Sequence, residues 1–298
     1  MLIQMIFNPH SGHGRGGKKY PEILKKLKDA GHTVIPHRTL YRNHASEIIQ
    51  QLNLYETDVI LSVGGDGTEY EVVNGVMKNS GKKVPPIGII PVGTGNSLAK
   101  DFNLFSMDDG IDAVLQRKSK AIDVLSFITN NKKHYFVNNM GFGFVADVSK
   151  NAEPLKKLGN VAYSITVITE TLKMNTHKLT LNIDGKIHKH DEALFCYFCN
   201  SVTVGGNMLI SPNSVMDDGI YEILVMDKVT RRDLLKTFPK IFKGTHINHP
   251  AITFYQGKKV TVETEPEKFC NPEGEIFGVT PLEVDILPKA LSFMYLDK

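Results

Sequence analysis

The chain has 298 residues, of which 41% are hydrophobic and 22% charged, and its formal net charge is +3 at pH 7. This length predicts two domains or one large α/β domain, because a single hydrophobic core is usually smaller. The near-average composition excludes low-complexity and disordered classes. The small net charge gives no argument for a nucleic acid partner, although it suits contact with anionic membrane surfaces or phosphorylated ligands.

The N-terminal segment Met1–Phe7 is apolar but short. It has no basic leading region, and Asn8-Pro9 interrupts it, so we expect a first strand and not a signal peptide. No apolar run approaches the ~20 residues of a membrane helix. Three cysteines, an odd number, agree with a reducing compartment. We therefore expect a cytoplasmic protein whose association with membranes is at most peripheral.

Residues 1–123 alternate apolar strand patterns with helical patterns. This alternation predicts a parallel sheet built from right-handed crossovers. The expected strands are 2–7, 33–37, 59–63 and 87–90. The expected helices are 21–30, 45–52 and 69–78, and a further helix begins near Asn96.

A glycine-rich turn, Gly64-Gly65-Asp66-Gly67-Thr68, lies between the third expected strand and the helix that follows. Glycines let backbone N–H groups approach a ligand closely, and a helix N-terminus adds its positive dipole end. Asp66 would repel a bare phosphate, so its expected partner is a cation such as Mg²⁺ held against nucleotide phosphates. An ordinary tight turn is the alternative interpretation.

Two further loops follow strands of the same sheet. Asn8-Pro9-His10-Ser11-Gly12 follows the first strand, and Pro91-Val92-Gly93-Thr94-Gly95-Asn96 follows the fourth. Ligands of open α/β sheets bind beyond the carboxyl ends of the strands, so we expect the three loops to converge. Arg15 and Lys18, just after the first loop, either reach a phosphate or are solvated charges.

From residue 124 onward the pattern changes to shorter alternating segments, which indicate a second domain of antiparallel strands. The expected strands are 121–128, 134–139, 178–183, 193–200, 220–225 and 251–263, with helices near 154–174 and 231–243. The segment 231–243 mixes basic and large apolar residues, which suits either an anionic interface or a surface helix packed by its apolar stripe.

The cysteine and histidine pairs give weak signals for metal binding. Cys196 and Cys199 are three apart in a strand-like run, and they therefore point to opposite faces. We interpret them as core residues. His188/His190 and His246/His249 have no partners at a zinc spacing, and we expect these histidines at the surface.

Several segments together resemble, in order and spacing, the diacylglycerol kinase catalytic family, which includes bacterial lipid kinases, sphingosine kinases and ceramide kinases. They are Gly64–Thr68, Pro91–Asn96, Asn139-Met140-Gly141-Phe142-Gly143-Phe144, and Lys156-Lys157-Leu158-Gly159 with Ala162-Tyr163. The resemblance implies ATP- and Mg²⁺-dependent phosphorylation of a lipid hydroxyl. It also implies a cleft between an α/β ATP-binding domain, residues 1–123 with a returning strand 289–298, and an antiparallel β-sandwich, residues 124–288.

The resemblance assigns roles to individual positions. It places ATP at Asn8, Pro9, His10, Ser11, Gly12, Gly64, Gly65, Asp66, Gly67, Thr68, Gly93, Thr94, Asn96 and Lys156, and more weakly at Thr39. It implies a magnesium site at Val215, Asp218 and Ile220, where a carboxylate and backbone carbonyls would supply oxygen ligands.

Two carboxylates are candidates for the general base. Glu275 matches the residue proposed as base in the bacterial branch, and Asp66 matches the residue given that role in other members. Glu273 replaces the usual aspartate two positions before Glu275, and its extra methylene would shift a carboxylate that contacts adenine or metal.

Two other departures concern the substrate. Ser97 stands where bacterial relatives have an aspartate, and Ser149 stands where sphingosine kinases have the aspartate that meets the substrate amine. A neutral lipid such as diacylglycerol is therefore the expected substrate. The alternatives are a sphingoid-base kinase, an enzyme like NAD kinase, which shares the glycine-Asp-glycine turn, and a nucleotide- or lipid-binding regulator without catalysis. A homodimer is kept as a candidate assembly.

Overall fold

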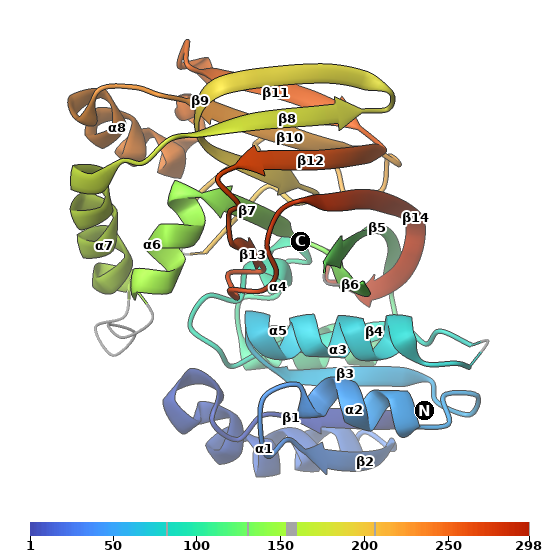
Figure 1. Ribbon diagram of the computed structural model, residues 1–298. Helices are drawn as coiled ribbons and strands as arrows, with labels where there is room; N and C mark the ends of the chain where they lie inside the picture. Colours follow the sequence, from blue (N-terminus) through green and yellow to red (C-terminus); the bar gives the residue numbers. More distant parts are fainter. Residues whose placement is uncertain (82, 130, 153–159, 206, 298) are drawn as a thin grey trace. The chain divides into compact units, whose positions relative to one another are not determined.

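The computed structural model describes residues 1–81, 83–129, 131–152, 160–205 and 207–297, and only the backbone of residues 160–164 (Figure 1). The residues form two compact units. The first unit is Met1–Asp123 with Lys289–Lys298, and the second unit is Val124–Pro288.

The first unit is built on a parallel sheet, as the sequence predicted. Its strands are β1 (Leu2–Phe7), β2 (Thr33–Arg38), β3 (Val59–Gly64), β4 (Ile87–Pro91) and the end of β14 (Leu282–Met294). They lie in the order β14-β4-β3-β1-β2 and all pair in parallel. Every residue of β3 and β4 is buried, because helices cover both faces of the sheet.

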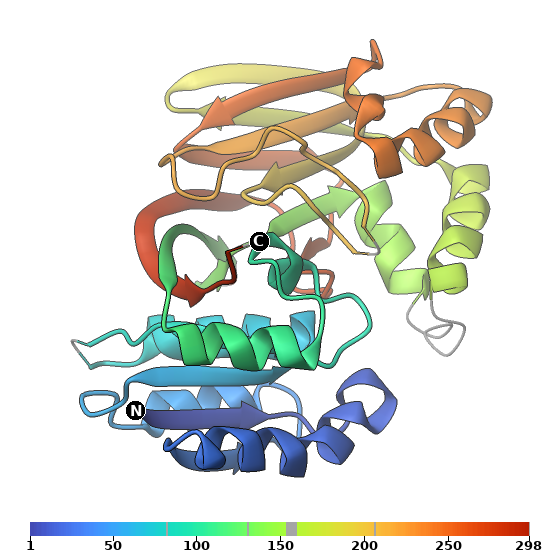
Figure 2. The ribbon, with the colours of Figure 1, turned by 180° about the vertical axis from the view of Figure 1, so that it is seen from behind.

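Helices α2 (His44–Gln51) and α3 (Asp66–Lys78) lie on one face of this sheet (Figure 1), and α1 (Ser11–Asp29) and α5 (Met107–Gln116) lie on the other (Figure 2). The short α4 (Ser97–Asp101) follows β4. Gly75 lets α3 approach α2 closely, since a Cβ there would lie 2.9 Å from Cβ of Ile49.

Helix α1 begins ten residues before the position expected from the sequence, where Pro21 was taken as the first residue. Gly12, His13 and Gly14 have left-handed backbone angles, and the right-handed helix continues from there with Pro21 inside it. Glycines disfavour a helix interior, but packing overrides this preference. A Cβ at Gly16 would lie 2.1 Å from the carbonyl oxygen of Asn8.

The second unit is antiparallel, as predicted. Its strands are β6 (Lys132–Phe136), β7 (Asn139–Gly143), β8 (His177–Ile183), β9 (Lys186–Cys199), β10 (Tyr221–Asp227), β11 (Ile252–Gly257), β12 (Lys259–Glu265), β13 (Cys270–Pro272) and parts of β5 (Ser119–Thr129) and β14. The long β9 pairs with β10 along one edge and with β8 and then β7 along the other. The mixed α/β fold with a C-terminal antiparallel β-sandwich is confirmed.

The expected strand 251–263 is two strands, so that prediction was wrong. β11 pairs with β10, whereas β12 pairs with β8 and β14. The chain changes partners at Lys258. The Asp184 carboxylate fixes the break, because it accepts hydrogen bonds from the N–H groups of Lys258 (3.1 Å) and Lys259 (2.9 Å).

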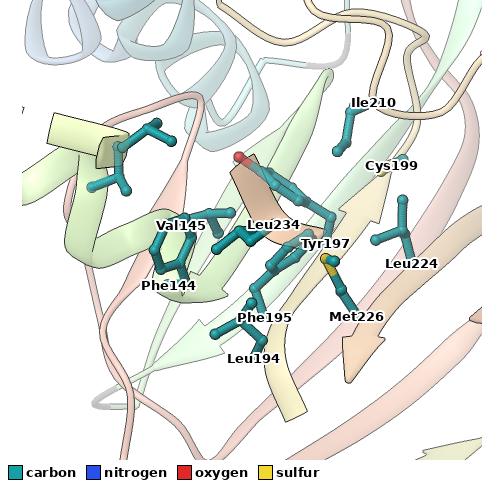
Figure 3. Close-up of a cluster of buried hydrophobic side chains, with 12 residues drawn as sticks. Phe144, Val145, Leu194, Phe195, Tyr197, Cys199, Ile210, Leu224, Met226 and Leu234 are labelled. Atoms are coloured by element: carbon teal, nitrogen blue, oxygen red, sulfur yellow. The ribbon is translucent and has the colours of Figure 1, made fainter. Parts of the chain in front are cut away.

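The second unit also contains three helices, α6 (Phe144–Ala152), α7 (Asn160–Lys173) and α8 (Arg231–Thr237). Two 3₁₀ turns follow α8, η2 (Phe238–Lys243) and η3 (Thr245–Asn248). α6 was not expected as a helix. A buried apolar cluster joins α6, α7 and α8 to β9 and β10 through side chains such as Val145, Phe195, Leu224 and Leu234 (Figure 3). None of the described helices is long and apolar enough to cross a membrane.

The core interpretation of the two cysteines is confirmed. Cys196 and Cys199 are buried in β9 and carry free thiols. Burial raises the pKa of both thiols well above its ordinary value, which keeps them protonated.

Candidate functional site

The three predicted loops of the first unit lie at one edge of its sheet. The strands are parallel and in register, with Phe7 level with Arg38 and Val63, and Gly64 level with Pro91. The loops that follow these residues therefore emerge together. Thr39 belongs to the same edge, because its N–H donates to the carbonyl of Phe7 at 3.0 Å.

Hydrogen bonds join the loops to one another. The Asn8 side-chain amide donates to Thr68 Oγ1 at 3.2 Å, and the N–H of Gly93 donates to the Gly64 carbonyl at 3.0 Å. Arg15 donates to the carbonyls of Gly12 (3.1 Å) and Gly93 (2.5 Å). Arg15 therefore clamps the first loop to the third, a role that the sequence did not indicate.

The loops approach one another so closely that several of their positions have no room for a side chain. A Cβ at Gly93 would lie 2.5 Å from Cα of Gly65, and one at Gly95 would lie 2.4 Å from Asp66 Oδ2. A Cβ at Gly12 would lie 1.9 Å from the carbonyl oxygen of Val92. These glycines therefore have a structural role in the packing of the loops. This role is compatible with a phosphate site at the same place.

The N-terminus of α3 offers donors to an anion. Gly65 is its N-cap, with an extended backbone and no side chain that could cap the helix. Thr68 and Glu69 donate to the carbonyl of Gly65, and the N–H of Asp66 interacts with the carboxylate of the same residue. The N–H of Gly67 comes too early in the helix for an intrahelical acceptor. Free donors at a helix N-terminus suit phosphate oxygens. The residues therefore fit the phosphates of a nucleotide.

Asp66 holds the third loop in place. Its Oδ2 accepts from the N–H of Asn96 at 2.8 Å, and its Oδ1 accepts from the N–H of Ser97 at 2.6 Å. Both donors lie at the start of α4, so the carboxylate acts as the cap of that helix. Burial raises the pKa of Asp66, although the two N–H donors and Lys100 act in the opposite direction.

Glu275 of the second unit lies in a tight turn after β13. Its N–H donates to the carbonyl of Pro272 at 2.9 Å, and the two central residues have positive φ, +52° for Glu273 and +81° for Gly274. Positive φ at both central positions defines a type I′ turn. Glu273 anchors this turn, because its carboxylate accepts from the N–H groups of Val137 (2.9 Å) and Asn138 (2.7 Å).

The predicted magnesium ligands lie in the chain segment that precedes β10. Asp218 Oδ1 accepts from the N–H of Ile220 at 3.2 Å, and Val215 is 46% exposed. The described residues contain no group of three or more His, Cys, Asp or Glu that could hold a metal ion. Magnesium at this turn would thus need backbone carbonyls in addition to Asp218, which is an oxygen set that suits the ion. Lys156, the predicted phosphate contact, lies outside the described residues.

The second unit also contains a partly open apolar cavity of about 60 Å³, which the sequence analysis missed. Side chains of α6, β9, β10 and the segment 231–243 line it, among them Phe144, Phe195, Met226, Leu234 and Phe238. The inward residues of that segment are 234, 237, 238 and 241, which is helical spacing. This spacing is the signal in the sequence that could have identified them.

Two of the histidines expected at the surface are buried, so that prediction was wrong. His246 is 2% exposed, lines the cavity and donates from Nε2 to the carbonyl of Ile210 at 3.1 Å. His190 is 9% exposed and contacts Asp227 and Tyr255. Hydrogen bonds inside the fold replaced the water that a surface position would have supplied.

Comparison with known proteins agrees with this geometry. Residues 3–127 match the diacylglycerol kinase catalytic domain, and residues 138–295 match the YegS C-terminal NAD kinase beta sandwich-like domain. The chain is 28% identical to a diacylglycerol kinase of Bacillus subtilis (strain 168) over 284 residues, which cover 94% of this chain and 91% of that protein.

Solved structures agree as well. A Bacillus anthracis str. Sterne crystal structure, provisionally assigned as a diacylglycerol kinase, superposes with a TM-score of 0.82 and 26% identity, covering 99% of this chain and 97% of that one. An NAD kinase from Archaeoglobus fulgidus in complex with ATP shares the fold alone, with a TM-score of 0.52, 14% identity, and coverage of 99% of this chain and 93% of that one. The chain belongs to the diacylglycerol kinase family of lipid kinases.

Proposed function

We propose that the protein transfers the γ-phosphoryl group of ATP, with Mg²⁺, to the hydroxyl of diacylglycerol or a related neutral lipid. The observation that carries this proposal is the apolar cavity of the second unit. Its lining offers little to hydrogen-bond the polar groups of NAD, but it suits a hydrocarbon chain.

The cavity must widen before it accepts an acyl chain. Its volume of about 60 Å³ is smaller than the ~150 Å³ of an apolar cavity that admits one benzene ring. Phe238 and Ile241 of the lining are only partly buried, so these side chains can shift outward at little cost in packing. The expected substrate is therefore a lipid whose chain displaces them.

The first unit supports the nucleotide part of the proposal. The N-terminus of α3, whose N-cap is Gly65, and the glycine-rich loops beside it would hold the phosphates of ATP through backbone N–H groups. Bound ATP would supply the phosphoryl group, and Mg²⁺ would neutralise the negative charge of that group. The Archaeoglobus fulgidus NAD kinase is described in complex with ATP, which favours ATP as the nucleotide of this fold.

Asp66 and Glu275 are the proposed carboxylates of the reaction. Asp66 lies at the start of α3, beside the proposed phosphate position, and it also fixes the start of α4. We assign to Glu275 the acceptance of the proton from the lipid hydroxyl. A lipid hydroxyl is a very weak acid, so the proton moves late in the reaction and the base need not be strong.

The first test of this function is transfer of labelled γ-phosphate from ATP, with Mg²⁺, to micellar lipids. The panel contains diacylglycerol, monoacylglycerol, phosphatidylglycerol, ceramide and sphingosine, with NAD in a parallel tube. We expect label in diacylglycerol. Label in sphingosine would identify a sphingoid-base kinase, and labelled NADP would overturn the lipid assignment. ATP binding without any product would identify a regulator.

Variants test the two carboxylates. We expect Glu275→Gln to lower kcat by roughly 10²–10⁴-fold, the usual contribution of a general base, and we expect Asp66→Asn to lower kcat as well. Glu263→Gln, on the exposed side of β12, is the matched control and should keep full activity. ATP affinity and the unfolding midpoint are measured on each variant, because Asp66→Asn also disturbs the cap of α4. A folded variant that retains activity would remove its residue from the chemistry.

A further inference from the structure

Helix α7 exposes three of its apolar residues and buries three of its polar ones, although Val167 also faces inward, and this arrangement is unusual for a helix that packs only against its own protein. Ile165, Ile168 and Leu172 are 41%, 55% and 67% exposed. Thr166, Glu170 and Thr171 are buried, with 1%, 6% and 1% of their surface exposed. The three exposed residues follow the spacing i, i+3, i+7 and therefore form one stripe. A surface helix normally buries such a stripe.

The buried polar side chains of α7 are satisfied, so this orientation is the stable one. Thr171 Oγ1 donates to the carbonyl of Val167 at 2.6 Å. Glu170 Oε1 accepts from the Asn151 side-chain amide at 3.0 Å and from Lys173 at 2.8 Å. Because these hydrogen bonds hold the polar side of α7 against the protein, the apolar stripe faces solvent. Contiguous exposed apolar residues mark interaction sites.

A basic segment lies beside the end of the stripe. Arg231 donates to the carbonyl of Leu172 at 2.9 Å, which ties the start of α8 to the end of α7. Within residues 231–243 the basic residues are Arg231, Arg232, Lys236, Lys240 and Lys243, and Asp233 is the one acidic residue. Asp233 accepts from Thr230 Oγ1 at 2.6 Å and so serves the N-cap of α8. Leu235 and Phe242 are exposed among these cations, at 42% and 45%.

We propose that the α7 stripe and the cations of residues 231–243, together called the docking face, bind the surface of an anionic lipid bilayer. A bilayer supplies both an apolar interior for Ile165, Ile168 and Leu172 and anionic headgroups for the basic side chains. A second copy of the chain is a poorer occupant, because a two-fold interface would bring the two basic segments against each other.

This inference rests on the proposed function and deepens it, because the segment that carries the cations also covers the apolar cavity. Four residues of this segment line the cavity, namely Leu234, Thr237, Phe238 and Ile241. Leu235 and Phe242 of the same segment are exposed to solvent. The side chains that separate the cavity from solvent would lie at the membrane surface after docking. A lipid could then pass from the bilayer to the cavity without its acyl chains crossing water.

Sedimentation with vesicles tests the docking face without any turnover. The full chain is mixed with vesicles of phosphatidylcholine alone or with equal parts of phosphatidylglycerol, at low and high salt. We expect binding to the anionic vesicles, weakened by salt. We expect Ile168→Gln with Leu172→Gln, and separately Lys240→Glu with Lys236→Glu, to lower the bound fraction by about tenfold or more.

Matched controls on the first unit separate the docking face from general surface effects. Leu115→Gln removes an apolar side chain that is 39% exposed on α5, and Lys28→Glu reverses an exposed charge on α1. Both controls should bind like the wild type. Equal binding to neutral and anionic vesicles, or equal losses in the controls, would overturn the proposal. So would a dimer that becomes a monomer in Ile168→Gln with Leu172→Gln.

Activity on a dispersed short-chain diacylglycerol separates this inference from the proposed function. We expect the docking variants to keep wild-type kcat on that substrate and to lose activity on vesicles. Wild-type protein that phosphorylates the short-chain lipid but binds no vesicles would refute the docking face alone. Protein that binds anionic vesicles but phosphorylates no lipid would refute the proposed function alone.

Discussion

Single residues in this protein often combine a structural bond with a proposed chemical role. Asp66 is the clearest case, because the sequence indicated a metal partner and the structure adds two N–H donors at the start of α4. Which residue types gather at the sheet edge was predictable, since strand ends and glycines are visible in the sequence. The clamp formed by Arg15 was not, because its acceptor, the Gly93 carbonyl, is 78 residues away.

His177 gives stability a dependence on pH. It is 3% exposed, no described residue hydrogen-bonds its ring nitrogens, and burial together with Lys268 lowers its pKa from 6.5 to about 4. Its contribution is fully present above pH 6.5 and is lost as the pH falls towards 4, because the unfolded chain takes up the proton first. The loss is at most roughly 3 kcal/mol.

We therefore expect His177→Leu to flatten the acid side of the stability curve. Urea unfolding at pH 7.5, 6.0 and 5.0 measures this, with each variant compared to the wild type at the same pH. The free energy of unfolding of the wild type should fall more between pH 7.5 and 5.0 than that of the variant. Parallel curves for the two proteins would show that His177 does not cause the dependence.

At the scale of elements, the turn at Glu273 shows why a side chain with one extra methylene is tolerated in place of aspartate. The carboxylate reaches the N–H groups of Val137 and Asn138, which join β6 to β7, and so it fixes the turn that carries Glu275. Its role is thus anchoring within the second unit. The positive φ of Glu273 is unfavourable for a residue with a side chain, and these hydrogen bonds offset that cost.

We expect Glu273→Ala to lower the free energy of unfolding by about 2–4 kcal/mol, because two backbone N–H groups lose their acceptor. Glu273→Gln, which keeps one acceptor oxygen, should cost less than half as much. Chemical denaturation measures both, with Glu267→Ala at an exposed position of the same unit as control. If Glu273→Ala matches this control, the carboxylate does not anchor the turn.

The periodic elements were the most predictable part of the fold. Strands β1 to β4 each lie within one residue of their expected bounds, and the buried β1, β3 and β4 show the apolar runs typical of strands covered on both faces. α6 was missed, because the sequence analysis expected no helix before residue 154. The orientation of α7 could not be predicted from the sequence either. Its apolar stripe predicts a buried face, and only tertiary contacts decide which side of the helix faces inward.

At the scale of the whole molecule, the first unit is assembled from both ends of the chain. Residues 289–298 complete it, with Leu291, Phe293 and Met294 buried at 1%, 1% and 3% exposure. Phe293 stacks on Phe102 at 5.2 Å between ring centroids, and it pairs with Ile87 of β4. The returning strand was foreseen only through the family resemblance, because strand order is not written in local patterns.

We expect removal of residues 289–298 to lower the thermal unfolding midpoint by more than 10 °C or to abolish soluble expression. Losing four buried apolar side chains, Leu291, Phe293, Met294 and Leu296, costs several kcal/mol, on the order of 2 kcal/mol each, and exposes the edge of β4. Truncation after Leu296 is the control, because it removes only the exposed pair of Lys118 with Asp297. Equal midpoints for the two truncations would contradict the expected role of the last strand.

The discontinuous first unit has a consequence for how the chain is made on the ribosome. Synthesis delivers Met1–Asp123 first, yet the part of β14 that covers the edge of β4 is translated only after the whole second unit. The second unit is contiguous in sequence, whereas the first unit keeps an open sheet edge until residues 289–294 have been synthesised. Until then the edge of β4 is unpaired on the nascent chain, and an unpaired strand edge is prone to aggregation.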